Sequence, residues 1–210
     1  MRLYHYLQAS YALEDIRNRR LKLATLHDLN DPFEWMGVVV AEEEYQKKVH
    51  DWHAEILFEH YGMACFSRLR DSILMWSHYG DRHRGICLGF DVHGDMPYEV
   101  TYTDDVAALQ RGGYSKTEEF FRRSIATKYR GWSYEQEWRV FEHRSAYSDG
   151  SFSFMPFDEN LNLKEVIAGD RCNTSRQEIK EALAEYPQEI DILKADRSPS
   201  AFEMIIGELG

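Results

Sequence analysis

The chain has 210 residues, of which 43% are hydrophobic, 29% charged and 14% aromatic. This length and composition predict one folded domain over residues 1–210 and exclude a disordered chain. The formal net charge of -11 disfavours binding to nucleic acid or anionic membranes through overall charge, although a local basic cleft can still bind nucleic acid.

The cysteines and the N-terminal residues predict where the protein works. Cys65, Cys87 and Cys172 are odd in number and form no CxxC motif, which favours a reducing compartment. The opening residues "MRLYHYLQAS" lack an apolar signal stretch, and no run approaches the ~18 apolar residues of a membrane span. We therefore expect a cytoplasmic protein that does not enter membranes.

The first half of the chain alternates between predicted strands and helices. A stripe of apolar residues at helical spacing predicts the clearest helix over residues 41–60. Ser10 is the expected cap of a helix over 11–19, and Asp71 or Ser72 the expected cap of one over 72–79. Alternating or continuous apolar runs predict strands over 2–7, 21–25, 63–67, 85–91 and 98–102.

The second half contains two capping boxes. "SKTE" (115–118) is expected to open a helix that runs to about Tyr129, and "SRQE" (175–178) one that ends before Pro187. Further strands are predicted over 133–141, 151–157, 164–169, 190–195 and 202–209. Because these elements do not form a regular βαβ alternation, we expect an α+β fold with a mixed or antiparallel split sheet and about four helices.

Two common kinds of site find no support in the sequence. No P-loop and no GxGxxG after a strand occurs, which disfavours Walker and Rossmann enzymes. His50 and His53 lie three residues apart on the predicted helix, but a metal site needs further ligands at suitable spacing. A solvated helix surface is the favoured interpretation, and no metal is predicted.

Residues 75–91, "MWSHYGDRHRGICLGFD", are dense in polar aromatic and basic side chains. His78 can titrate near neutral pH, and Arg82 and Arg84 flank a histidine beside a glycine. Cations at a helix end and a glycine turn can hold an anion such as a diphosphate. A core helix followed by a solvated turn explains the same pattern, and both interpretations stay open.

Residues 133–141, "SYEQEWRVF", are predicted to form a strand in which charged residues occupy every second position. Side chains alternate along a strand, so Glu135, Glu137 and Arg139 should share one face. The aromatic residues on either side should desolvate a carboxylate and raise its pKa, which suits stabilisation of positive charge on a sugar ring in glycosyl transfer. The alternative is a solvated ladder of charges with Tyr134 and Trp138 in the core.

Taken as a set, several motifs resemble an uncharacterised bacterial family, domain of unknown function 2971, over most of residues 1–170. These motifs are "NDPFE" (30–34), "ACFS" (64–67), "MWSHYGDRHRGICLGFD" (75–91) and "WSYEQEWRVF" (132–141). The opening strand, short helix and second strand are also distantly similar to the ADP-ribosyltransferase fold. That likeness implies a fold in which a first-strand histidine and a late-strand glutamate act on NAD.

The ADP-ribosyltransferase likeness implies roles for three catalytic residues. His5 would bond a ribose hydroxyl, although Tyr4 and Tyr6 compete for this first-strand role. Glu137 would stabilise the oxocarbenium ion as nicotinamide leaves, and Glu135 would orient or deprotonate the acceptor. The residues that the likeness implies for NAD binding are His5, Ser67, Trp76, His78, Tyr79, Arg82, Arg84 and Arg139.

The predicted function is therefore an NAD-dependent ADP-ribosyltransferase, a toxin or phage-defence effector that modifies nucleic acid or protein. One alternative is a non-catalytic module that binds a small-molecule nucleotide or a partner protein. Another is a nucleic-acid hydrolase of the abortive-infection type. The sequence does not determine the acceptor or the oligomeric state.

Overall fold

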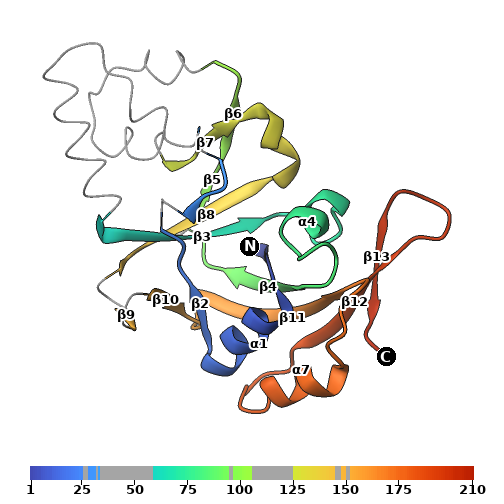
Figure 1. Cartoon of the computed structure of the whole chain (residues 1–210). Coiled ribbons are helices and arrows are strands. Elements are labelled where there is room, and N and C mark those ends of the chain that lie inside the picture. The colour runs from blue at the N-terminus through green and yellow to red at the C-terminus, as the bar shows by residue number, and fades with distance from the viewer. Residues whose placement is uncertain are drawn as a thin grey trace, which may run out of the picture. The chain divides into compact units, whose positions relative to one another are not determined.

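The computed structural model describes residues 1–25, 28–31, 33, 59–94, 97–105, 125–144, 148–149 and 152–210 (Figure 1). Residues 41–58 of the predicted helix over 41–60 and residues 115–124 of that predicted over 115–129 lie outside these ranges, as do His50 and His53. The chain forms two compact units. Unit 1 contains Met1–Leu21, Cys65–Met96 and Met155–Gly210, and unit 2 contains Lys22–Ala64 and Pro97–Phe154. Because each unit is assembled from separate segments, no linker marks the boundaries in the sequence.

Unit 1 is built on a mixed sheet, as the sequence predicts. The central strand β4 (Ile86–Val92) pairs antiparallel with β1 (Arg2–Leu7) on one side and with β11 (Leu161–Gly169) on the other. β12 (Asp191–Arg197) pairs parallel with β11 and antiparallel with β13 (Met204–Glu208). The last part of β3, from Cys65, adds to β1 through the pair Tyr4 and Ser67. In sheet order the strands are β13 (Met204–Glu208), β12 (Asp191–Arg197), β11 (Leu161–Gly169), β4 (Ile86–Val92), β1 (Arg2–Leu7) and β3 (Tyr61–Ser67).

Three helices of unit 1 match predicted positions: α1 (Ala9–Asn18), α4 (Ile73–His78) and α7 (Arg176–Ala182). Ser72 caps α4 by accepting a hydrogen bond from the Met75 amide, and Ser175 and Glu178 form the predicted capping box of α7. The predicted cap Ser10 is wrong, because α1 begins at Ala9, two residues before the predicted start, and Gln8 precedes it without a side-chain cap. None of the helices in the described ranges is long and apolar enough to span a membrane.

The two faces of the unit 1 sheet bury different side chains. On one face α1 packs against α7 and β4 (Figure 1), and its Ala12 and Ile16 are completely buried. On the other face the ring of Trp76, from α4, meets Tyr6 edge-on with 5.0 Å between the ring centroids. Both packings remove aliphatic and aromatic area from water, the main favourable term in folding.

The second segment of unit 2 contains two pairs of short strands. β5 (Tyr98–Glu99) pairs antiparallel with β8 (Glu137–His143), and β6 (Thr101–Thr103) pairs parallel with β7 (Thr127–Tyr129). Unit 2 also contains β9 (Ser148–Asp149), residue 22 of β2 (Arg20–Lys22) and residues 152–154 of β10 (Phe152–Pro156). A 3-10 helix, η2 (Arg130–Glu135), links β7 to β8.

Three predicted boundaries in unit 2 are wrong. The strand expected over 98–102 is divided at Val100 into β5 and β6. The helix expected to reach Tyr129 ends earlier, because Thr127–Tyr129 pairs with β6. The strand expected over 133–141 begins only at Glu137, after η2 and the left-handed residue Gln136 (φ 44°). In the first two cases pairing with distant residues overrides the local pattern.

Gly85 is required by close backbone contact in unit 1, so Gly85→Ala is expected to destabilise the protein. An added Cβ would lie 2.2 Å from the Leu7 carbonyl oxygen and 2.9 Å from that of Gly80. Relieving such overlap with backbone costs about 1–3 kcal/mol or more of the free energy of unfolding. Urea denaturation measures this loss. Gly94→Ala is the matched control, because a Cβ there has no atom within 4 Å, and equal stabilities of the two variants would contradict the argument.

Candidate functional site

The turn into β8 brings both glutamates of "YEQEWR" onto one lysine. Gln136 adopts a left-handed conformation between η2 and β8, and this kink lets residues on both sides of it point the same way. Lys128 Nζ lies 2.6 Å from Glu135 Oε2 and 3.1 Å from Glu137 Oε2. The two carboxylates therefore share a single ammonium group from β7.

Arg139 completes the network from the next inward position of β8. Its Nε donates to Glu137 Oε1 at 2.7 Å, and its Nη2 to Glu137 Oε2 at 3.0 Å. Its Nη1 donates to the Ile125 carbonyl oxygen at 2.9 Å. The side chains of Lys128, Glu135, Glu137 and Arg139, here called the buried tetrad, are only 1–6% exposed. With two cations and two anions the tetrad is balanced in formal charge.

The structure decides between the two interpretations of this strand and corrects one expectation. The charged side chains face the interior of unit 2 while Tyr134 and Trp138 are half-buried, so the solvated ladder is wrong. The expected rise in pKa is also wrong. Burial raises the pKa of Glu137, but the charges and hydrogen bonds of Arg139 and Lys128 outweigh it and lower the pKa to about 2.

The low pKa of Glu137 predicts a loss of stability in acid. The folded state holds the proton less tightly than the unfolded state, whose pKa is near 4.5. The stabilisation is therefore fully present above about pH 4.5 and is lost as the pH falls toward 2. Urea denaturation between pH 6 and about pH 3 should show this decline. Glu137→Gln has no carboxylic proton at this position, so its decline over the same range should be smaller, and equal declines would contradict the assignment.

A rim of half-buried aromatic side chains adjoins the buried tetrad. The Glu137 amide donates to Tyr102 Oη at 2.8 Å. Lys128 Nζ lies 5.2 Å from the centroid of the Trp132 ring, and Trp132 Nε1 donates to Asp31 Oδ2 at 2.6 Å. Lys128, Tyr102, Trp132 and Asp31 were not among the predicted site residues. Tyr102 and Asp31 come from other parts of the chain, and Lys128 and Trp132 precede the motif on β7 and η2, so the alternation within residues 133–141 does not include them.

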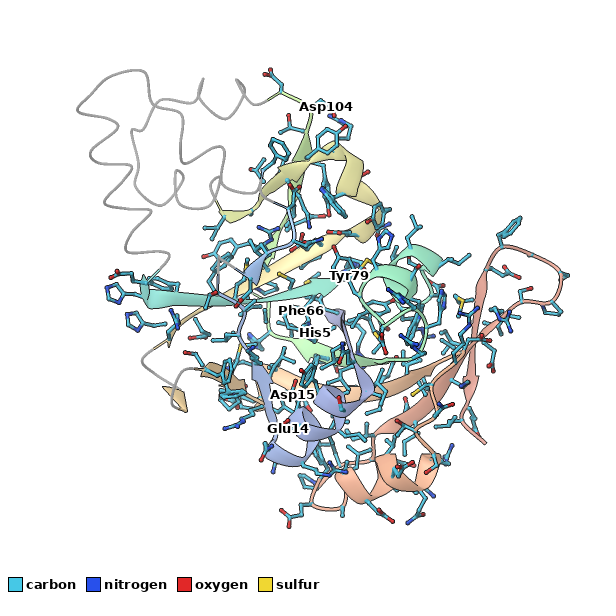
Figure 2. All side chains as sticks on the ribbon, viewed as in Figure 1. His5, Glu14, Asp15, Phe66, Tyr79 and Asp104 are labelled. Carbon is cyan, nitrogen blue, oxygen red and sulfur yellow. The ribbon has the colours of Figure 1, made fainter. Side chains whose placement is uncertain are left out.

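The predicted first-strand residues of unit 1 lie on different faces of its sheet. Tyr4 is directly opposite Ser67, so these two and Tyr6 share a face. His5 points to the other face, where its ring meets Phe66 edge-on at 5.7 Å (Figure 2). The predicted pairing of His5 with Ser67 in one cluster is therefore not present in unit 1.

His5 has a defined tautomer. Its Nδ1 lies 2.7 Å from the Cys65 carbonyl oxygen, and because a carbonyl only accepts, Nδ1 carries the hydrogen and Nε2 the lone pair. Burial lowers the pKa of the His5 imidazole. The ring is therefore neutral at pH 7, with Nε2 as a hydrogen-bond acceptor.

The predicted residues on and after α4 differ in exposure. Trp76 is completely buried, and its Nε1 donates to the Arg70 carbonyl oxygen at 2.9 Å, so its ring offers no open face to a ligand. Tyr79 is half-buried and His78 exposed, with 6.3 Å between their ring centroids. In the left-handed turn that follows, Arg82 is exposed and Arg84 pairs with Asp81 at 3.0 Å. α4 is thus a core helix followed by a solvated turn, as one of the two interpretations expects.

The structure brings together one part of the predicted site. Glu135, Glu137 and Arg139 belong to one network in unit 2, although Glu135 enters this network from η2 and not from the predicted strand. The other predicted residues belong to unit 1, and they are His5, Ser67, Trp76, His78, Tyr79, Arg82 and Arg84. Within the described ranges, no three side chains of His, Cys, Asp or Glu converge as a metal site would require.

The fold is α+β with a mixed sheet, and the clearest site is a buried balanced network of charges beside aromatic side chains. Residues 75–140 match the model of a family described as protein of unknown function, DUF2971. This match confirms the family resemblance over the segment from α4 to the inward-facing part of β8. No curated protein and no solved structure matches the chain.

Proposed function

We propose that this protein is an NAD-dependent ADP-ribosyltransferase in which Glu137 is the main catalytic residue. The observation that carries the proposal is the buried tetrad, in which Lys128 and Arg139 keep Glu137 ionised down to about pH 2. A carboxylate that is ionised and shielded from water is suited to stabilise a developing sugar cation. The segment that matches the family model ends within this motif.

The reaction follows from that chemistry. The bond between C1′ of the ribose and the nicotinamide nitrogen breaks, and its electron pair leaves with nicotinamide. Glu137 stabilises the positive charge on the ribose, and an acceptor nucleophile forms the new bond to C1′. The proton of the acceptor passes to Glu135 or to water. With water as the acceptor the same steps release free ADP-ribose.

The part of the unit 1 residues in NAD binding stays a prediction for each residue separately. His5 offers an acceptor nitrogen for a ribose hydroxyl, Tyr79 a half-buried ring, and Arg82 an exposed cation. The acceptor is predicted to be nucleic acid or protein. The role as a toxin or phage-defence effector also stays a prediction.

The test is nicotinamide release from NAD by the purified chain, measured by chromatography with and without DNA, RNA and a cell extract as acceptors. We expect release that is faster with the correct acceptor, together with transfer of labelled ADP-ribose to it. Absence of NAD binding in a calorimetric titration at millimolar NAD would overturn the proposal.

One observation favours the second candidate, a non-catalytic nucleotide-binding module. Both carboxylate oxygens of Glu137 already accept hydrogen bonds, and the residue is only 5% exposed. Such a network can serve to hold a binding surface in place. This candidate predicts NAD affinity without nicotinamide release. Incubation of the same preparation with RNA and DNA, with and without divalent metal, tests the predicted hydrolase.

A further inference from the structure

Trp132 is held in place by an acid that is distant in sequence but belongs to the same unit. Its Nε1 donates to Asp31 Oδ2 at 2.6 Å across a sequence separation of 101 residues. Asp31 is 7% exposed, and its other oxygen accepts from the Phe33 amide at 2.9 Å. The carboxylate is thus fixed by its own turn, and through it the indole is fixed as well.

The Trp132 ring is coupled to the buried tetrad. Lys128 Nζ lies 5.2 Å from its centroid, and the same ammonium bonds Glu135 and Glu137. The ring of Tyr134 is 6.1 Å away at an angle of 46°. Trp132 and Tyr134 are both half-buried. Part of an aromatic surface therefore stays open to solvent next to the carboxylates.

A purely structural role for this indole would not need Asp31. The N–H of a partly exposed tryptophan can be satisfied by water at little cost. The bond to a buried carboxylate instead restricts the ring to one orientation. Such restriction lowers the entropy lost when a ligand binds to the ring. The arrangement is the one expected for a binding surface that is prepared in advance.

We infer that Asp31 is a positioning residue and that the Trp132 ring which it holds is the stacking surface for the nicotinamide ring of NAD. This inference rests on the proposed function. The nicotinamide ring is chosen because it is attached to the ribose carbon on which Glu137 acts, and Trp132 and Glu137 share Lys128. An electron-rich indole also attracts the positively charged ring of NAD. Trp76, which the ADP-ribosyltransferase likeness implied for NAD binding, is completely buried and takes no part in this stacking.

Calorimetric titration of the full chain with NAD tests the inference. Trp132→Ala should weaken NAD binding roughly tenfold or more, since stacking on an aromatic side chain contributes about 1–3 kcal/mol per base. Trp132→Phe keeps a ring and should bind better than Trp132→Ala. Asp31→Ala should weaken binding less than Trp132→Ala, and Asp31→Asn, which retains an oxygen acceptor, less again. Asp104→Ala is the matched control, because Asp104 (Figure 2) is an exposed acid of unit 2. Its partner is the exposed Arg130.

A double variant separates positioning from a general effect on folding. The phenylalanine ring has no N–H, so adding Asp31→Ala to Trp132→Phe should weaken NAD binding no further. An additional loss in that background overturns the positioning role of Asp31. Unchanged affinity of Trp132→Ala and Asp31→Ala overturns the inference while the proposed function stands. A wild-type chain that binds no NAD overturns both. Thermal denaturation of each variant shows that folded protein is being compared.

Discussion

Glu137→Gln is expected to lower nicotinamide release from NAD by about a hundredfold or more, the usual loss when one preorganised electrostatic group is removed from an active site. The substitution keeps the size of the side chain and its ability to accept a hydrogen bond from Arg139. It removes the negative charge that the proposed reaction needs. NAD binding should persist, because the expected loss is in the transition state and not in the ground state. Single-turnover measurement of nicotinamide release, with calorimetry for affinity, checks both parts.

Glu135→Gln is the matched control for this result. It removes the same charge from the same ammonium group of Lys128, but it leaves the pair of Glu137 and Arg139 intact. We expect it to reduce transfer to an acceptor more than the hydrolysis of NAD, because Glu135 is proposed to take the proton of the acceptor, whereas the proton released in hydrolysis can pass to bulk water. If Glu137→Gln and Glu135→Gln slow hydrolysis equally, Glu137 has no special role. If the wild-type chain binds NAD without turnover, the binding module is the correct function.

Lys128→Met is expected to lower the free energy of unfolding by about 3–5 kcal/mol, the range for removing one partner from a buried ion pair. Two carboxylates that are 2% and 5% exposed would then lose the ammonium group that they share, and Arg139 would still pair with Glu137. Methionine keeps most of the side-chain volume, so the loss reports charge and hydrogen bonding more than packing. Urea denaturation at neutral pH measures it.

A charge-balanced double variant tests whether unbalanced buried charge causes this loss of stability. Lys128→Met combined with Glu135→Gln removes one cation and one anion and leaves Glu137 paired with Arg139 through two hydrogen bonds. The double variant should therefore be more stable than Lys128→Met alone, because breaking a buried pair costs more than replacing it with neutral groups. Losses that simply add would show that charge balance does not govern this network.

The position of the candidate site was partly visible in the sequence. Alternation in "YEQEWR" predicted that Glu135, Glu137 and Arg139 share a side, and the three do meet around one carboxylate network. The route differs, since Glu135 reaches it from a 3-10 helix and not from the strand. Lys128 could not be foreseen, because β7 is a strand only through its pairing with β6. The predicted rise in the pKa of Glu137 was wrong because Lys128, one of the two cations that lower this pKa, had not been identified.

The sequence by itself determined the α+β class, most strands of unit 1, the capped helices α4 and α7, and the DUF2971 resemblance, which the family model supports over residues 75–140 of the expected 1–170. These features depend on residues a few positions apart, whose spacing a sequence displays directly. Tertiary structure alone decided that the charged side chains of "YEQEWR" face inward and that Asp31 holds Trp132. It also decided which partners meet His5, whose side chain points to the other face of the sheet from those of Tyr4 and Tyr6. The physical reason is that burial, and with it the pKa and orientation of a side chain, is set by partners far away along the chain.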